Sequence, residues 1–155
     1  MKGKVVLFCG IPGSGKTTIA GLLADRLAPQ VDRVRLLSSD NLRAPVYKRI
    51  FRAVSGRDPA EILILDATFF KKELRSEVKA RARPDTVLKI YIDCPLEIAL
   101  QRNRERHPSI SEKALRIMFH RMEPPDHPTI RIDAARTSPE AAVAKICDLM
   151  KNEMS

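Results

Sequence analysis

The chain has 155 residues, of which 44% are hydrophobic, and its formal net charge at pH 7 is +9. This composition excludes a disordered chain, and no apolar run approaches the roughly 20 residues that a membrane-spanning helix needs. The length predicts a single domain over residues 1–155, and the excess of basic residues favours anionic partners, with nucleic acid among them.

Apolar runs of strand length alternate with helical patterns along the chain. The expected strands cover residues 4–9, 33–38, 61–66, 86–92 and 129–133. The expected helices cover residues 17–28, 41–54 with an early interruption at Pro45, 71–83, 96–106, 111–122, and a last segment that opens at 138–140. This alternation predicts an α/β fold in which helices cover both faces of a five-stranded parallel sheet.

The first expected strand leads into a segment with the pattern GxxxxGK[ST], which is typical of a phosphate-binding loop. A strand, a glycine-rich loop and a helix follow one another here, as a nucleotide-binding loop requires. Lys16 is expected to reach the β- and γ-phosphates of ATP, and the Thr17 hydroxyl to bind Mg²⁺. The predicted ATP-binding residues of this segment are Gly10, Ile11, Pro12, Gly13, Ser14, Gly15, Lys16, Thr17 and Thr18.

Two further strand ends carry carboxylates. Asp40 follows the second strand, where it could accept the proton of a substrate hydroxyl, and Arg43 comes one expected helical turn later, where it could bind a substrate phosphate. Asp66 ends the third strand beside the loop and could hold Mg²⁺. At this stage a helix cap for Asp40 and a strand-end turn for Asp66 stay open as alternatives.

A dense basic segment runs from Arg102 to Arg106 and closes one expected helix before a proline-containing link. Arg102 and Arg106 are four residues apart and therefore share a helix face. A basic hairpin of this kind can close over ATP and neutralise charge on the transferring phosphoryl group, which predicts a helical lid over about residues 102–122. The alternative is a solvated helix face with local ion pairs.

In this order of motifs the chain resembles the small P-loop kinases around the polynucleotide 5′-hydroxyl kinases, the zeta-type toxins and the archaeal seryl-tRNA(Sec) kinases. The segments that carry the likeness are residues 10–17, 39–43, 66–68, 71–75, 94–97 and 102–106. The resemblance implies a three-layer P-loop NTPase fold with a lid. It also implies that Asp40 accepts the proton, that Arg43 contacts the substrate, and that Arg106, assisted by Arg102, stabilises the transferring phosphoryl group. Thr68 and Arg75, in the matched segments, are expected to bind the acceptor.

We therefore predict an ATP- and Mg²⁺-dependent kinase with Lys16, Asp40 and Arg106 as catalytic residues. The acceptor hydroxyl stays open among a nucleic-acid 5′-hydroxyl, a nucleoside or nucleotide, adenylylsulfate, and another small metabolite. The alternative class is a nucleotide-dependent regulatory ATPase that binds RNA or a protein partner. The first strand lies too close to the N-terminus for a signal peptide, and the three cysteines lack metal-type spacing, so we expect a cytoplasmic protein with buried thiols.

Overall fold

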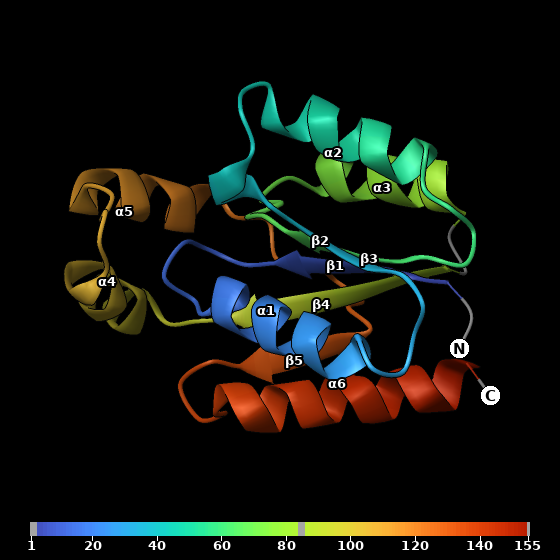
Figure 1. The fold of residues 1–155 in the computed structure, drawn as a ribbon. Coiled ribbons are helices and arrows are strands. Elements are labelled where there is room, and N and C mark those ends of the chain that lie inside the picture. The colour runs from blue at the N-terminus through green and yellow to red at the C-terminus, as the bar shows by residue number, and fades with distance from the viewer. Residues whose placement is uncertain (1–2, 84–85, 155) are drawn as a thin grey trace.

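The computed structural model describes residues 3–83 and 86–154 of the chain (Figure 1). The strands are β1 (Val5–Cys9), β2 (Val34–Ser38), β3 (Ile62–Asp66), β4 (Val87–Asp93) and β5 (Ile130–Asp133). The helices are α1 (Lys16–Leu27), α2 (Val46–Ser55), α3 (Lys72–Ala82), α4 (Leu96–Glu105), α5 (Glu112–Arg121) and α6 (Pro139–Met154), with a 3₁₀ turn at Ser39–Asn41. No helix in the described ranges is long and apolar enough to cross a membrane.

The strands form one sheet in the order β2-β3-β1-β4-β5, and all neighbouring strands are parallel. Every residue of β1 and β3 is buried because helices cover both faces of the sheet. The predicted five-stranded parallel α/β fold is confirmed. In a sheet of this kind the carboxyl ends of the strands share one edge, where ligands bind.

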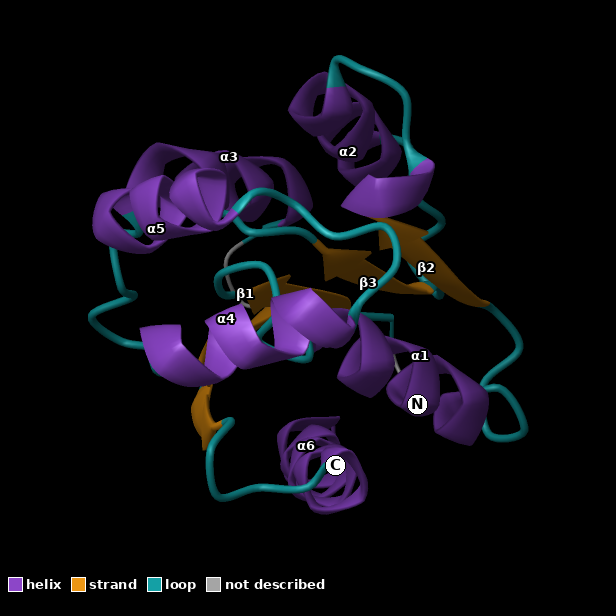
Figure 2. Ribbon diagram, turned by 90° about the vertical axis from the view of Figure 1, so that its left-hand side faces the viewer, coloured by secondary structure: helices purple, strands orange, loops and turns teal. Residues whose placement is uncertain are grey.

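Two hydrophobic clusters lie on opposite faces of the sheet. Alternate residues of β1 divide between them: Val6 and Phe8 belong to one cluster, and Val5 and Leu7 to the other. The first cluster includes residues of α1 and α6, and the second includes residues of α2 and α3. Figure 1 shows these helix pairs below and above the sheet, whereas α4 and α5 lie together beyond its carboxyl edge (also seen end-on in Figure 2).

The segment after β2 differs from the expected helix over residues 41–54. A 3₁₀ turn ends at Asn41, Leu42 is extended with φ −104° and ψ 137°, and α2 begins only after Pro45. Proline lacks a backbone N–H and disfavours helical backbone in the residue before it, so the helix starts at Val46 instead. Arg43 is therefore not one helical turn beyond Asp40, and that part of the prediction is wrong.

Candidate active site

The phosphate-binding loop between β1 and α1 depends on its glycines. Gly10, Gly13 and Gly15 have φ values of 154°, 81° and 98°, which residues with a Cβ rarely adopt. Space is limited as well, because a Cβ on Gly13 would lie 2.8 Å from the carbonyl oxygen of Ala99. The loop therefore combines left-handed backbone with close packing against α4.

Lys16 and Ser14 make the loop suitable for an anion. Lys16 is only 7% exposed, and its Nζ donates to the carbonyl oxygen of Ile11 at 3.1 Å. Burial lowers the pKa of Lys16, and the negative charge of Asp66 opposes that shift. Ser14 Oγ is buried without a hydrogen-bond partner in the described part of the chain, and a phosphate oxygen would supply one.

Asp66 lies beside the loop at the end of β3 and is 2% exposed. Its Oδ2 accepts hydrogen bonds from Thr17 Oγ1 at 2.8 Å and from Ser38 Oγ at 2.7 Å. Hydroxyl and carboxylate oxygens are the ligands that Mg²⁺ prefers, and two of them leave positions for phosphate oxygens and water. Thr17 and Asp66 thus fit the predicted metal site. The hydrogen bonds of Asp66 favour this role over the alternative of a turn residue at the end of the strand.

Ser38 is a part of this arrangement that the sequence did not indicate. Ser38 ends β2 and is paired with Asp66 in the register between β2 and β3. Once that pairing is known, its side chain is expected to lie beside the carboxylate. No local pattern distinguishes Ser38 from Ser39 in the sequence. The role of Ser38 could be predicted only from the register between β2 and β3.

Asp40 and Arg106 form an ion pair with each other. Arg106 Nη2 donates to Asp40 Oδ2 at 2.9 Å, and the two side chains are 37% and 56% exposed. Asp40 lies within the 3₁₀ turn, whose N-cap is Ser38, and the N-cap of α2 is Pro45, so Asp40 occupies neither capping position. The helix-cap alternative is therefore not supported.

Donor and acceptor sides share one cavity of about 360 Å³. It is lined by Pro12, Gly13, Gly15, Lys16, Thr17, Thr18, Ser39, Asp40, Asp66, Thr68, Arg102 and Arg106. Thr68 is joined to the loop directly, because its carbonyl oxygen accepts from the Gly10 N–H at 3.1 Å. Most residues predicted from separate motifs therefore converge in space.

Arg102 and Asn103 anchor α4 rather than face solvent. The Arg102 guanidinium donates to the carbonyl oxygens of Ser14 at 2.9 Å and Ala134 at 3.1 Å. The Asn103 side chain is 3% exposed and pairs with both backbone groups of Ile110, at 2.7 and 3.1 Å. Asn103 was missed because nothing in a basic segment marks one amide as the residue that holds the turn between α4 and α5.

Two predicted acceptor residues lie outside this cavity. Arg43 is exposed, and its carbonyl oxygen accepts from Arg49 Nε at 3.0 Å. Arg75 is 4% exposed on α3, and its Nη1 donates to the carbonyl oxygen of Phe69 at 2.6 Å. The expectation that Arg43 and Arg75 line the acceptor site together with Asp40 is therefore corrected.

Fold and cavity define a P-loop protein with a phosphoryl-transfer site. Residues 5–125 match the AAA domain family, and the chain belongs to that family. It is 29% identical to the adenylyl-sulfate kinase of Burkholderia ambifaria over 92% of this chain and 89% of that relative.

Solved kinases have the same fold. The structure of the Mycobacterium tuberculosis APS kinase in complex with AMPPNP and APS superposes with a TM-score of 0.73 at 18% identity, covering 97% of this chain and 98% of the other. A gluconokinase from Sinorhizobium meliloti gives a TM-score of 0.75 at 18% identity, covering 97% and 94%. The solved structures confirm the fold, and the sequence relatives with the family match confirm the predicted class, an ATP-dependent P-loop kinase that phosphorylates a hydroxyl group.

Proposed function

We propose that this kinase transfers the γ-phosphoryl group of ATP to a small nucleotide acceptor, with adenylylsulfate as the first candidate. The observation that carries the proposal is the position of Asp40 and Arg106 in the same cavity as Lys16, Thr17 and Asp66. The curated relatives are adenylyl-sulfate kinases, which makes that acceptor the first to test.

The charges that line the cavity suit an anionic acceptor. Lys16, Arg102 and Arg106 supply three cations against the carboxylates of Asp40 and Asp66. Bound Mg²⁺, held by Thr17 and Asp66, would add positive charge on the donor side. An acceptor that carries a sulfate or phosphate group is therefore favoured over a neutral one.

In the proposed reaction the loop and Lys16 hold the phosphates of ATP, while Asp40 accepts the proton of the acceptor hydroxyl. The hydroxyl oxygen forms a bond to the γ-phosphorus as the bond from that phosphorus to the β–γ bridging oxygen breaks, and ADP leaves. Arg106 moves from Asp40 toward the transferring phosphoryl group and offsets its charge. The α4–α5 segment acts as the lid that carries this arginine.

The test is transfer of label from γ-labelled ATP to adenylylsulfate, nucleosides, gluconate and an oligonucleotide with a 5′-hydroxyl. We expect adenylylsulfate to accept label, and Asp40→Asn to lower kcat by about 10²-fold or more while ATP binding persists. Asp148→Asn, an exposed carboxylate on α6, serves as the matched control. Full acceptor-dependent turnover in Asp40→Asn would exclude the assigned base, and slow hydrolysis without transfer to any acceptor would favour the regulatory ATPase.

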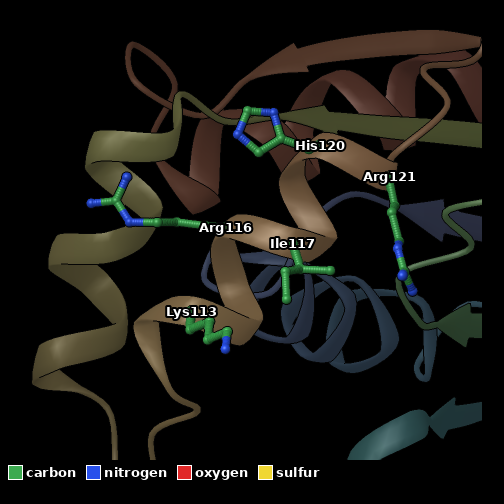
Figure 3. Close-up of a pocket in the computed structure, with 5 residues that line it drawn as sticks. All are labelled: Lys113, Arg116, Ile117, His120 and Arg121. Carbon is green, nitrogen blue, oxygen red and sulfur yellow. The ribbon is translucent and has the colours of Figure 1, made fainter.

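A nucleic-acid 5′-hydroxyl is a second candidate, and the exposed face of α5 favours it. Lys113, Arg116, His120 and Arg121 surround Ile117, which is 42% exposed, and line a surface cavity of about 470 Å³ (Figure 3). Basic side chains of this kind contact phosphates, and α5 lies next to the helix that precedes Arg106 (Figure 1). If a nucleic-acid strand binds to this face of α5, we expect Arg116→Ala to raise KM for the oligonucleotide and to leave KM for adenylylsulfate unchanged.

The state of the three cysteines is informative about the cellular compartment of the protein. Cys9, Cys94 and Cys147 are free and buried, as predicted. Burial raises the pKa of Cys9 to about 11, against the opposing charges of Arg75, Lys89 and Lys16, so the thiol stays protonated at neutral pH. Unpaired thiols suit a reducing compartment, which supports the expected cytoplasmic location.

A further inference from the structure

A second cavity, of about 590 Å³, lies between α3, β4 and the connector that follows α5. Its basic lining residues are Lys72, Arg75 and Lys79 on α3 and Lys89 on β4, and residues 122–127 form its other wall. It shares no lining residue with the active-site cavity. We propose that this basic cavity binds a small anion with at least two negative charges, of the phosphate or sulfate class.

The cations of this cavity form no ion pair within the part of the chain that the structure describes. Lys72, Arg75 and Lys79 are spaced at three and four residues, so they share one face of α3. Among the side chains that the structure describes, no ion pair includes these three residues or Lys89. Four positive charges therefore converge on one space.

Arg75 is the strongest single observation. It is 4% exposed, and the one hydrogen bond that its guanidinium makes to residues 3–83 or 86–154 goes to a neutral carbonyl, that of Phe69. A guanidinium has five N–H donors, and a buried charge is costly unless a counter-charge accompanies it. A phosphate or sulfate oxygen would provide both the acceptor and the charge.

Lys79 and Lys89 reinforce this argument. Burial lowers the pKa of Lys89, and the nearby positive charges of Lys79 and Arg75 lower it further. Neighbouring positive charges repel each other, and a bound anion would offset that repulsion. Glu123 and Asp126 also line the cavity, but both are exposed, and neither forms an ion pair with these cations in the described part of the chain.

The wall between the two cavities is the loop after β3. Thr68 lines the active site, and the next residue, Phe69, is held by Arg75. The backbone of Phe69 has φ 45°, and its N–H donates to the Tyr47 hydroxyl oxygen at 3.0 Å. An anion on Arg75 would therefore act on a segment that is already fixed from both sides, and its binding does not depend on which acceptor the kinase uses.

The test is the thermal unfolding midpoint of the full chain, with the P-loop saturated by ADP and Mg²⁺ so that added anions cannot bind there. Pyrophosphate, phosphate and sulfate are titrated against sodium chloride at equal ionic strength. We expect a saturable rise in the midpoint with pyrophosphate. In the double variant Lys79→Gln/Lys89→Gln we expect the Kd for pyrophosphate to rise by about tenfold or more. The anion-free midpoint should be equal or higher, since the repulsion between the two ammonium groups is gone.

The control is Lys48→Gln/Lys145→Gln, which removes two exposed lysines outside the cavity and should keep the pyrophosphate response. Lys79→Gln alone provides a milder variant whose anion-free midpoint reports whether it folds. A rise no larger than that with sodium chloride, or an equal rise in the cavity variant and the control, would overturn the proposed anion site. Failure of adenylylsulfate as acceptor would leave this result unaffected, so the two proposals fail separately.

Discussion

The two sides of the active-site cavity are built differently. On the donor side, Lys16 and Asp66 are 7% and 2% exposed and hydrogen-bond to fixed partners within the fold. On the acceptor side, Asp40 and Arg106 are partly exposed, and within the described residues the side chain of each pairs with the other alone. We therefore propose that the donor site is preformed and that the acceptor site is completed by its substrate, and each prediction below tests that contrast.

Removing the donor cation should have the largest effect. Lys16→Ala is expected to lower kcat by roughly 10³-fold, because no other group replaces the charge on the β- and γ-phosphates. The measurement is steady-state turnover with the acceptor that the labelling panel identifies. Lys145→Ala on α6 is the control, since Lys145 is exposed and far along the chain from the loop. Turnover within tenfold of the wild type would contradict the expectation that the donor side depends on the Lys16 charge.

Neutralising the second donor residue should cost less. Asp66→Asn keeps an oxygen that can accept hydrogen bonds from Thr17 and Ser38 but loses the negative charge. We therefore expect kcat to fall by about 10²-fold and the Mg²⁺ concentration that gives half-maximal turnover to rise. Asp66→Ala leaves both hydroxyls without their acceptor and should also lower the free energy of unfolding by about 1–3 kcal/mol. Turnover against Mg²⁺ concentration and urea unfolding measure the two effects. An unchanged Mg²⁺ dependence would exclude Asp66 as a ligand.

Breaking the turn between α4 and α5 tests how firmly the lid is positioned. Asn103→Ala leaves the N–H and carbonyl of Ile110 unpaired and should lower the free energy of unfolding by about 1–2 kcal/mol. Arg104→Ala is the neighbouring control, because its ion pair with Glu112 is exposed and contributes about 0.5 kcal/mol or less. Equal losses in urea unfolding for both variants would contradict an anchoring role for Asn103.

The smallest effect belongs to the acceptor-side pair. A double-mutant cycle of Asp40→Ala and Arg106→Ala should give a coupling energy to stability below about 1 kcal/mol, since exposed ion pairs contribute little. The coupling should disappear in high salt, because the charges are screened. A coupling that is large and insensitive to salt would mean that the acceptor side is preformed as well, and the contrast would fail.

The sequence predicted best where the signal is local. The strand, the glycine-rich loop and α1 follow one another directly, and the backbone conformation of the loop is encoded by its own glycines. Asp66 could be anticipated because a buried strand that ends beside the loop leaves a carboxylate at the shared edge. Those features need no knowledge of distant contacts.

Predictions failed where the partner is far away or where the backbone departs from a helix. Leu42 is extended and α2 begins only after Pro45, so the three-residue spacing of Asp40 and Arg43 does not correspond to a helical turn. Arg75 matched a motif, but its burial on α3 turns it toward Phe69 and the second cavity. Ser38 and Asn103 act through strand register and a backbone turn, neither of which their residue type reveals.

Arg102 links the phosphate-binding loop to a residue that lies outside the segment matched by the family. The matched segment ends at residue 125, yet one of the two carbonyls that Arg102 holds belongs to Ala134, after β5. The other belongs to Ser14 in the phosphate-binding loop, 88 residues earlier than Arg102 itself. A single guanidinium thus joins the phosphate-binding loop to the segment between β5 and α6, which lies beyond the matched range.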